Sequence, residues 1–273
     1  MGRQGKWLEL AALVETIADG TCLAIPADYG GVAMAATLAL IRSGVRHLHL
    51  VTAPTSGLQA DLLIGAGCVA SLETAGISLG EYGAAPGFRA ASAAGTLTLA
   101  ESTCPAQHAA LQASEKGVPF IPLRGILGTD LLAQRPDWLV IQNPLSETDD
   151  PIVLIPAIRP DVALFHAALA DAAGNVWIGV RRELATLAHA ARTTLVTVEA
   201  LHPGNLLNDP TLAAGTLPHL YVTQVALAPG GTWPLGFADE VPADGAALAR
   251  YAAAAKTPEG FTSLLEDWLD ERA

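Results

Sequence analysis

Hydrophobic residues along the chain follow two alternating spacings, one typical of buried strands and one typical of helices. Short apolar runs rich in Leu, Val and Ile, bounded by Gly, Pro or Asp, predict strands. Apolar residues that recur every three or four positions predict helices between them. We expect strands at residues 21–27, 47–53, 68–73, 95–103, 161–167 and 193–201. We expect helices at residues 7–18, 32–44, 58–67, 105–117, 182–192 and 257–273.

A further pair of strands, residues 137–144 and 151–157, is expected on either side of the acidic turn "SETDD". Alternating strands and helices predict an α/β fold, with a three-layer, open, mostly parallel sheet and helices on both faces. Because the chain has no internal repeat or low-complexity linker, we expect residues 1–273 to form a single domain. In such sheets, ligands bind at the carboxyl ends of strands. The polar positions expected there are residues 28–31, 52–57, 101–103, 166–175 and Glu199.

Composition favours a compact protein with a large core, because 51% of the residues are hydrophobic and 15% are charged. The net charge is −12 and the basic residues are scattered, which argues against a nucleic-acid partner. No apolar run approaches the roughly 20 residues needed to cross a bilayer, and the first residues lack the apolar core of a signal peptide. We therefore expect a cytoplasmic protein with no membrane partner.

Several common cofactor and metal signals are missing from the sequence. The three cysteines, Cys22, Cys68 and Cys104, lie far apart and form neither a disulfide framework nor a metal-ligand spacing. Neither a G-x-G-x-x-G nor a G-x-x-x-x-G-K motif occurs, so dinucleotide and P-loop binding are not supported. The tripeptide Arg-Pro-Asp precedes two apolar strands, at residues 135–137 and 159–161, and we assign no chemistry to it. We expect no bound metal.

Residues 160–179, "PDVALFHAALADAAGNVWIG", contain two candidate catalytic side chains, His166 and Asp171. They could form a base with its orienting carboxylate, but no nucleophile lies beside them in the sequence. The alternative, which we favour, is a hydrogen-bonded histidine at a strand end and an aspartate that shapes the turn. Gly174 and Asn175 are a strong local signal for such a turn.

Two further segments carry candidate chemistry. Gly30 and Gly31 follow a strand and precede a helix, so their N–H groups could bind an oxyanion or only permit a tight turn. Glu101 ends an alternating strand and could act as a base or nucleophile in apolar surroundings that raise its pKa. The alternative is an ordinary solvated glutamate near a helix N-terminus. Ser102, Thr103 and Cys104 are interpreted as capping residues in preference to nucleophiles.

Five segments, in order, resemble the α (A) subunit of the family I coenzyme A transferases, in particular that of glutaconate CoA-transferase and its relatives in steroid-ring degradation. The most specific is "PAIRPDVALFHAALADAAGNVWIG", which matches the family's pattern of Pro-Asp-Val, His-Ala, Ala-Asp and Gly-Asn. The others are "DLLIGAGCVASLETAGISLG", "GVPFIPLRGILGTDL", "TTLVTVEAL" and "ALAPGGTWP". The resemblance covers nearly the whole chain.

The resemblance implies an open α/β sheet paired with a homologous β subunit, in an αβ or α2β2 hetero-oligomer. It implies no permanently bound cofactor, and a coenzyme A thioester as substrate. In the family, a glutamate attacks the thioester and passes through an anhydride to a glutamyl-CoA intermediate. That glutamate belongs to the β subunit of two-subunit members, and "VTAPTSG" here has no glutamate at the corresponding strand end. The chain is therefore expected to supply one wall of a shared site.

The residues expected to contact substrate or coenzyme A are Gly30, Gly31, Thr55, Ser56, Gly57, Ser102, His166 and Asn175. The steroid-ring hydrolases that resemble this family carry a functional glutamate in the α subunit, and Glu101 lies at a similar place ahead of "GVPFIPLRG". Glu101 is therefore the candidate catalytic residue of this chain. Three functions stay open: part of a CoA transferase, part of a hydrolase that opens a ring-derived acyl-CoA, and a catalytically silent scaffold or ligand sensor.

Overall fold

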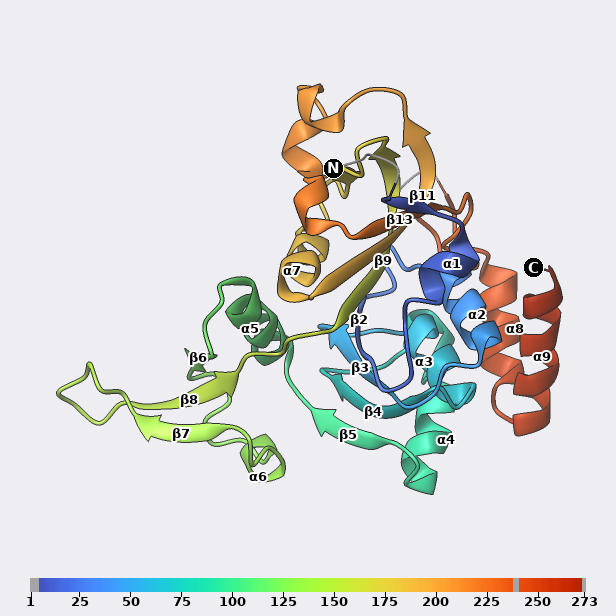
Figure 1. Cartoon of the computed structure of the whole chain (residues 1–273). Coiled ribbons are helices and arrows are strands. Elements are labelled where there is room, and N and C mark those ends of the chain that lie inside the picture. The colour runs from blue at the N-terminus through green and yellow to red at the C-terminus, as the bar shows by residue number, and fades with distance from the viewer. Residues whose placement is uncertain (1–4, 238–240, 272–273) are drawn as a thin grey trace.

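The computed structural model of the protein describes residues 5–237 and 241–271. Its centre is a mostly parallel sheet, seen at the middle of Figure 1. In spatial order the main strands are β1 (Trp7–Leu8), β13 (Gln224–Leu227), β11 (Thr193–His202), β9 (Val162–Asp171), β2 (Cys22–Pro26), β3 (Leu48–Ala53), β4 (Val69–Thr74) and β5 (Thr98–Glu101). Each strand in this row runs parallel to its neighbours. The carboxyl ends of these strands therefore meet along one edge of the sheet.

Helices cover both faces of this sheet, which confirms the predicted α/β fold (Figure 1). On one face lie α1 (Leu10–Val14), α2 (Met34–Ser43), α3 (Leu58–Gly65), α4 (Pro86–Ala94), α8 (Gly245–Ala254) and α9 (Pro258–Glu271). On the other lie α5 (Cys104–Glu115) and α7 (Arg182–Ala190). Alternate residues of β2 serve the two layers, because Leu23 and Ile25 belong to the first core and Ala24 to the second.

The strand expected at 161–167 continues to Asp171 and then reverses direction. It forms an antiparallel hairpin with β10 (Val176–Trp177), which also pairs with β12 (Thr216–Leu217). His166 therefore lies in the middle of β9, and the expectation that it ends a strand was wrong. The turn expected at Gly174-Asn175 is confirmed, since Gly174 has φ 87°.

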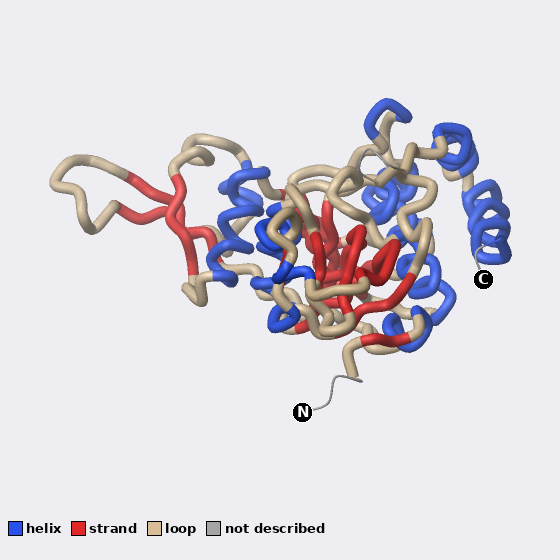
Figure 2. Tube along the Cα trace, turned by 90° about the horizontal axis from the view of Figure 1, so that it is seen from above, coloured by secondary structure: helices blue, strands red, loops and turns tan. Residues whose placement is uncertain are grey.

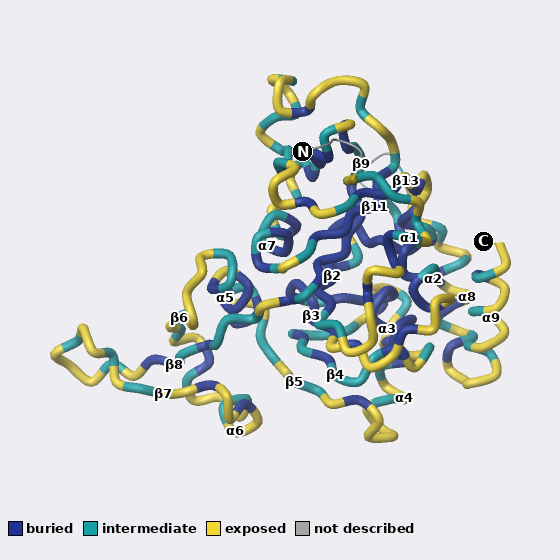
Figure 3. The backbone as a smooth tube through the Cα atoms, in the orientation of Figure 1, coloured by how far each residue is buried: buried dark blue, intermediate teal, exposed yellow. Residues whose placement is uncertain are grey.

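A second, antiparallel sheet projects from the main body and is built from β6 (Phe120–Leu123), β8 (Pro151–Pro156) and β7 (Leu139–Gln142) (Figures 1 and 2). The short helix α6 (Leu131–Gln134) precedes β7. A small core with Trp138, Val153 and Ile155 joins this sheet to α5. Figure 3 shows that the tip of the projecting sheet is mostly exposed. The predicted pair of strands around "SETDD" is thus confirmed, but in a sheet of its own.

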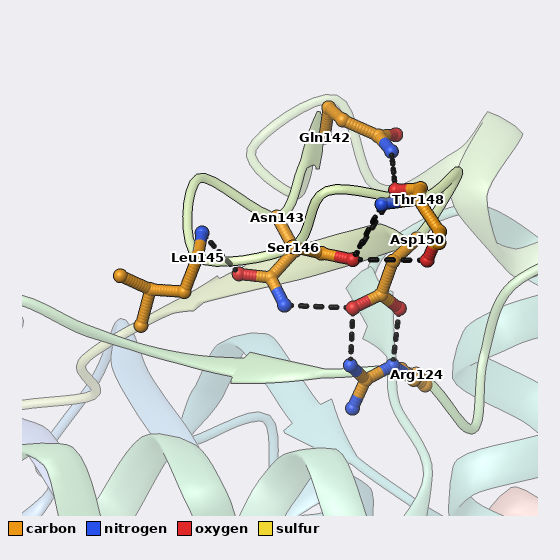
Figure 4. Close-up of polar contacts among 7 residues, drawn as sticks. All are labelled: Arg124, Gln142, Asn143, Leu145, Ser146, Thr148 and Asp150. Atoms are coloured by element: carbon orange, nitrogen blue, oxygen red, sulfur yellow. Dashed lines mark hydrogen bonds and ion pairs between the residues drawn. The ribbon is translucent and has the colours of Figure 1, made fainter.

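The loop between β7 and β8 is held by hydrogen bonds that converge on the carboxylate of Asp150 (Figure 4). Arg124 donates from Nε and Nη2 to the two carboxylate oxygens of Asp150, at 2.8 and 2.6 Å. Asn143 donates to the same carboxylate at 2.7 Å, and its own carbonyl oxygen accepts from the backbone N–H of Leu145 at 3.0 Å. These contacts explain why an acidic segment makes an ordered turn here.

Several elements differ from the expectations. The helix expected over 7–18 is replaced by β1 and the short α1, because Trp7 and Leu8 pair with β13 at the sheet edge. The pattern did not predict α4, α6 and α8, nor the strands β6, β10, β12 and β13. Short 3-10 helices occur as η1 (Gly80–Tyr82), η2 (Leu206–Asn208), η3 (Ala213–Gly215) and η4 (His219–Tyr221). None of the helices in the described ranges is long and apolar enough to span a membrane.

Candidate active site

The carboxyl ends of β2, β3 and β4 meet around a cavity of about 500 Å³. Residues 27–29 follow β2, Thr55 and Ser56 follow β3, and residues 76–82 follow β4. The cavity is closed from the other side by Leu235, Leu248 and Tyr251. Its place matches the strand ends where open α/β sheets bind ligands, and its size suits a small molecule.

Asp28 is the carboxylate held most firmly at this cavity. Its two oxygens accept the backbone N–H groups of Gly57 and Leu58, each at 3.0 Å, at the start of α3. Burial raises the pKa of Asp28 to about 6, although both N–H bonds favour the charged form. A Cβ on Gly57 would lie 2.2 Å from the Asp28 carboxylate, so glycine is required there. Gly57, which was expected to contact substrate or coenzyme A, thus has its N–H already bonded to Asp28.

The loop after β3 is fixed by its backbone. Ser56 donates its N–H to the carbonyl of Gly76 at 3.2 Å, and Ser78 donates its N–H to the carbonyl of Ser56 at 3.2 Å. Ser56 is buried, and its hydroxyl has no hydrogen-bond partner within residues 5–237 and 241–271. The backbone thus holds Thr55 and Ser56 in the lining of the cavity, and the buried Ser56 hydroxyl is unsatisfied within the described residues.

Gly30 and Gly31 bring the turn after β2 against β9. The N–H of His166 donates to the carbonyl of Gly31 at 2.7 Å, and Gly30 donates to the carbonyl of Ala27 at 2.7 Å. Gly31 has φ 91°, and a Cβ there would lie 2.3 Å from the His166 carbonyl oxygen. The N–H of Gly30 is therefore used within the turn, and Gly31 permits a close approach of two backbones.

The carboxylate partner of His166 is Glu199, not Asp171. His166 is fully buried, with Nε2 2.8 Å from Glu199 Oε1 and Nδ1 2.8 Å from Thr197 Oγ1. The other Glu199 oxygen accepts the N–H of Gly230 at 2.7 Å. Burial opposes ionisation of Glu199, but these hydrogen bonds outweigh it and hold its pKa below the usual value. His166 also lines a hollow of about 250 Å³ with Arg181 and others.

Asp171 and Asn175 hold the hairpin together through their hydrogen bonds. Asp171 accepts the N–H groups of Ala173, Asn175 and Leu206 and the side-chain amide of Asn175, at 2.7–3.0 Å. The Asn175 carbonyl oxygen accepts the N–H of His219 at 2.8 Å. Both side chains are buried. The interpretation of Asp171 as a turn-shaping residue is confirmed.

Glu101 and Ser102 lie one strand further along the same edge. Glu101 is the exposed last residue of β5, and its carbonyl accepts from Arg135 Nη1 at 2.9 Å. Arg135 is buried, and its guanidinium also bonds Glu73 and Asp137, each at 2.8 Å. The N–H of Ser102 donates to the carbonyl of Thr74, which places Ser102 beside β4. Glu101 is not among the residues that line the 500 Å³ cavity.

The family model for coenzyme A transferases matches residues 8–228 of the chain. The chain belongs to the coenzyme A transferase family. It is 32% identical over 267 residues to the A subunit of the 3-oxoadipate CoA-transferase of Pseudomonas knackmussii, covering 95% of this chain and 90% of that protein. It is 29% identical over 246 residues to the cholesterol ring-cleaving hydrolase IpdA subunit of Rhodococcus jostii, covering 86% and 82%.

This transferase-family chain spans about half (51%) of an uncharacterised Archaeoglobus fulgidus protein to which it is 32% identical. Among solved structures, it is similar to the glutaconate coenzyme A-transferase of Acidaminococcus fermentans, with a TM-score of 0.87 and 25% identity over 97% of this chain and 89% of that one. It is also similar to the decarboxylase AibA/AibB C56S variant, with a TM-score of 0.83 and 32% identity over 97% and 98%.

Sequence reasoning about this CoA-transferase chain missed the role of Asp28 and the pairing of Glu199 with His166. The sequence did contain a signal for this pair. Thr197 and Glu199 are two residues apart on β11, so their side chains lie on the same face of the strand, and Thr197 is paired with His166 on β9. Asp28 had a weaker signal, as a carboxylate directly after a buried strand. The structure brings Thr55, Ser56 and Gly57 together with Asp28, and it places His166 at the neighbouring hollow and Glu101 beyond the lining of the cavity.

Proposed function

We propose that the chain is the A-type subunit of a heteromeric CoA transferase that moves coenzyme A between an acyl-CoA and a carboxylic acid. The nucleophilic glutamate would come from a homologous β subunit. The proposal is carried by the residues at the end of β3. At the corresponding strand end of the β subunit, the family resemblance implies the reactive glutamate. This chain has Thr55 and Ser56 there, and both oxygens of the nearby Asp28 are bonded to helix N–H groups.

The proposed reaction has four balanced steps. A glutamate oxygen attacks the thioester carbon and expels CoA thiolate, giving an acyl-glutamyl anhydride. The thiolate attacks the glutamyl carbon, releases the donor acid as a carboxylate and leaves glutamyl-CoA. The acceptor carboxylate attacks this thioester, forms a second anhydride and expels the thiolate again. The thiolate then takes the acceptor acyl group and restores the glutamate, with N–H donors stabilising each oxyanion.

The test is to produce the chain with a candidate β subunit, then to mix the complex with an acyl-CoA and a second carboxylic acid. Mass spectrometry follows both CoA thioesters and free CoA. Transfer without net release of CoA is the expected result. Release of CoA that does not depend on the second acid would contradict a transferase.

The second candidate is a hydrolase that opens a ring-derived acyl-CoA, with Glu101 as base. It is favoured by the exposed carboxylate of Glu101 at the ligand edge of the sheet, together with the likeness to the R. jostii IpdA subunit. In this case Glu101→Gln abolishes hydrolysis by the complex, whereas Glu266→Gln, at an exposed position on α9, leaves it unchanged. Full activity of Glu101→Gln would exclude this role for the residue.

A further inference from the structure

The wall of the 500 Å³ cavity is mostly apolar. Most of its hydrophobic side chains come from the segment after β4 and from the C-terminal part of the chain, among them Ile77, Leu79, Tyr82, Leu235 and Leu248. The ionisable carboxylates of this wall are Asp28 and Glu81. No Lys, Arg or His from the described ranges lines it. The cavity therefore offers apolar surface and negative charge, without a cation.

This distribution of charge disfavours a ligand that carries an anionic group on its tail, in addition to the carboxyl group that reacts. A carboxylate or phosphate loses its hydration on entry and needs an Arg, a Lys or a dense set of N–H donors in return. Here it would meet Asp28 and the exposed Glu81 instead. Arg181 stacks at 5.5 Å from the ring centre of Tyr29, but it lines the separate hollow beside His166.

One polar atom of this wall lacks a partner. The Ser56 hydroxyl is buried and makes no hydrogen bond within the described residues. Buried hydroxyl groups are nearly always satisfied, and this one has almost no accessible surface, so it would meet a ligand oxygen after rotation about χ1 to another staggered position. Its backbone N–H and carbonyl are both bonded to the neighbouring loop, so this hydroxyl sits on a fixed backbone.

We propose that the cavity binds the acyl group of a monocarboxylic acid whose tail is apolar and uncharged, with the Ser56 hydroxyl donating to an oxygen of the reacting carboxyl group. The proposal rests on the proposed CoA transfer and names its substrate class. The apolar tail lies against Ile77, Leu79 and Leu248, where each further buried CH₂ should strengthen binding about fourfold. A dicarboxylic acid places its second carboxylate in the same apolar, negatively lined space and is rejected.

The first experiment compares hexanoate with adipate, which have the same number of carbons, as acceptors for the complex of this chain with its β subunit. The expected result is a preference for hexanoate in kcat/KM of about tenfold or more. Glu81→Lys, which adds a cation at an exposed position of the wall, should reduce this preference, and Glu81→Gln should reduce it less. Equal or better use of adipate by the wild-type complex would overturn the proposal.

Binding measurements distinguish a failure of this acyl-site proposal from a failure of the proposed transferase function. Calorimetry measures the affinity of the same complex for hexanoyl-CoA and adipoyl-CoA. If no acid accepts CoA, the transferase proposal fails, and tighter binding of hexanoyl-CoA still supports the apolar acyl site. Tighter binding of adipoyl-CoA contradicts the site, whether or not transfer occurs.

The second experiment replaces the unsatisfied hydroxyl. Ser56→Ala removes no hydrogen bond of the described structure, so its melting temperature should equal or exceed that of the wild type. Its KM for hexanoate should rise about tenfold, the value of one hydrogen bond of roughly 1.4 kcal/mol. The exposed Ser263→Ala on α9 is the control and should change neither quantity. A lower melting temperature with an unchanged KM would assign Ser56 a structural role and overturn this contact.

Discussion

The imidazole Nε2 of His166 lies 2.8 Å from Glu199 Oε1, which joins the middle of β9 to the neighbouring strand β11. Thr197 holds the other ring nitrogen at 2.8 Å. Glu199 in turn accepts the N–H of Gly230, and a Cβ on Gly231 would come within 2.9 Å of the His166 ring. This network fixes the loop after β13 against the sheet.

Glu199→Gln should therefore destabilise the fold by about 1–3 kcal/mol at neutral pH, because charge-assisted hydrogen bonds are replaced by weaker ones. The pKa of Glu199 is below its ordinary 4.5 in the folded chain, so its stabilising effect is present above pH 4.5 and is lost as the pH falls through the lowered pKa. Urea unfolding at several pH values measures this. A difference from wild type that grows on acidification would contradict it, and Glu266→Gln is the exposed control.

Asp28→Ala should also lower stability, because it leaves the N–H groups of Gly57 and Leu58 without their acceptor. Its pH dependence has the opposite sign from that of Glu199. Burial raises the pKa of Asp28 from 3.8 to about 6, so its contribution is complete below pH 3.8 and is lost as the pH rises through about 6. The stability gap between wild type and Asp28→Ala should shrink by on the order of 2 kcal/mol across that interval. A gap that widens with rising pH in denaturant titrations would disprove the assignment.

Gly31→Ala should prevent stable folding or lower stability by about 3 kcal/mol or more, because the new methyl group meets the His166 carbonyl at 2.3 Å. Gly44→Ala is the matched control. Gly44 also has a positive φ, 81°, but a Cβ there meets no atom within 4 Å, so only about 1–2 kcal/mol of backbone strain is expected. Equal losses of stability for the two variants in thermal unfolding would show that backbone strain alone, without the contact with His166, accounts for the requirement for glycine at position 31.

Arg135→Met should destabilise the chain by about 3 kcal/mol, since it removes the buried cation that bonds Glu73, Asp137 and the carbonyl of Glu101. Arg124→Met on the exposed projecting sheet is the comparison, and its solvent-screened ion pair with Asp150 should contribute less to stability than the buried contacts of Arg135. Chemical denaturation of both variants checks the order. A larger loss of stability for Arg124→Met than for Arg135→Met would contradict the expected order of the two ion pairs.

Periodicity predicted most of the sheet and its helices, because burial of each strand leaves an apolar run that local sequence shows directly. It failed where small residues dominate. The end of β9 is rich in alanine, which is uncommon in strands, and α4 carries too few large apolar residues to show a helical face. The residues of β1 were assigned to a helix because a strand of two residues is too short to show an alternating hydrophobic pattern.

The candidate site was less predictable, because its contacts join residues far apart in the sequence. Thr55, Ser56 and Gly57 were expected at the ligand edge and are found there, but Asp28 was recognised only as part of a polar turn. Tyr251 and Leu248 reach the cavity from α8, and no local pattern relates them to β2 or β3. Arg135 was interpreted as the residue before a strand, yet it is a buried ion-pair partner of β4.

We propose that this chain forms one wall of a shared site and that a partner carries the reacting carboxylate. The direct measurement is intact-mass spectrometry of the complex with its β subunit, purified and then briefly incubated with an acyl-CoA. The predicted result is an adduct of CoA, formed with loss of water, on a glutamate of the β subunit, not on this chain. A CoA adduct on this chain would contradict the claim.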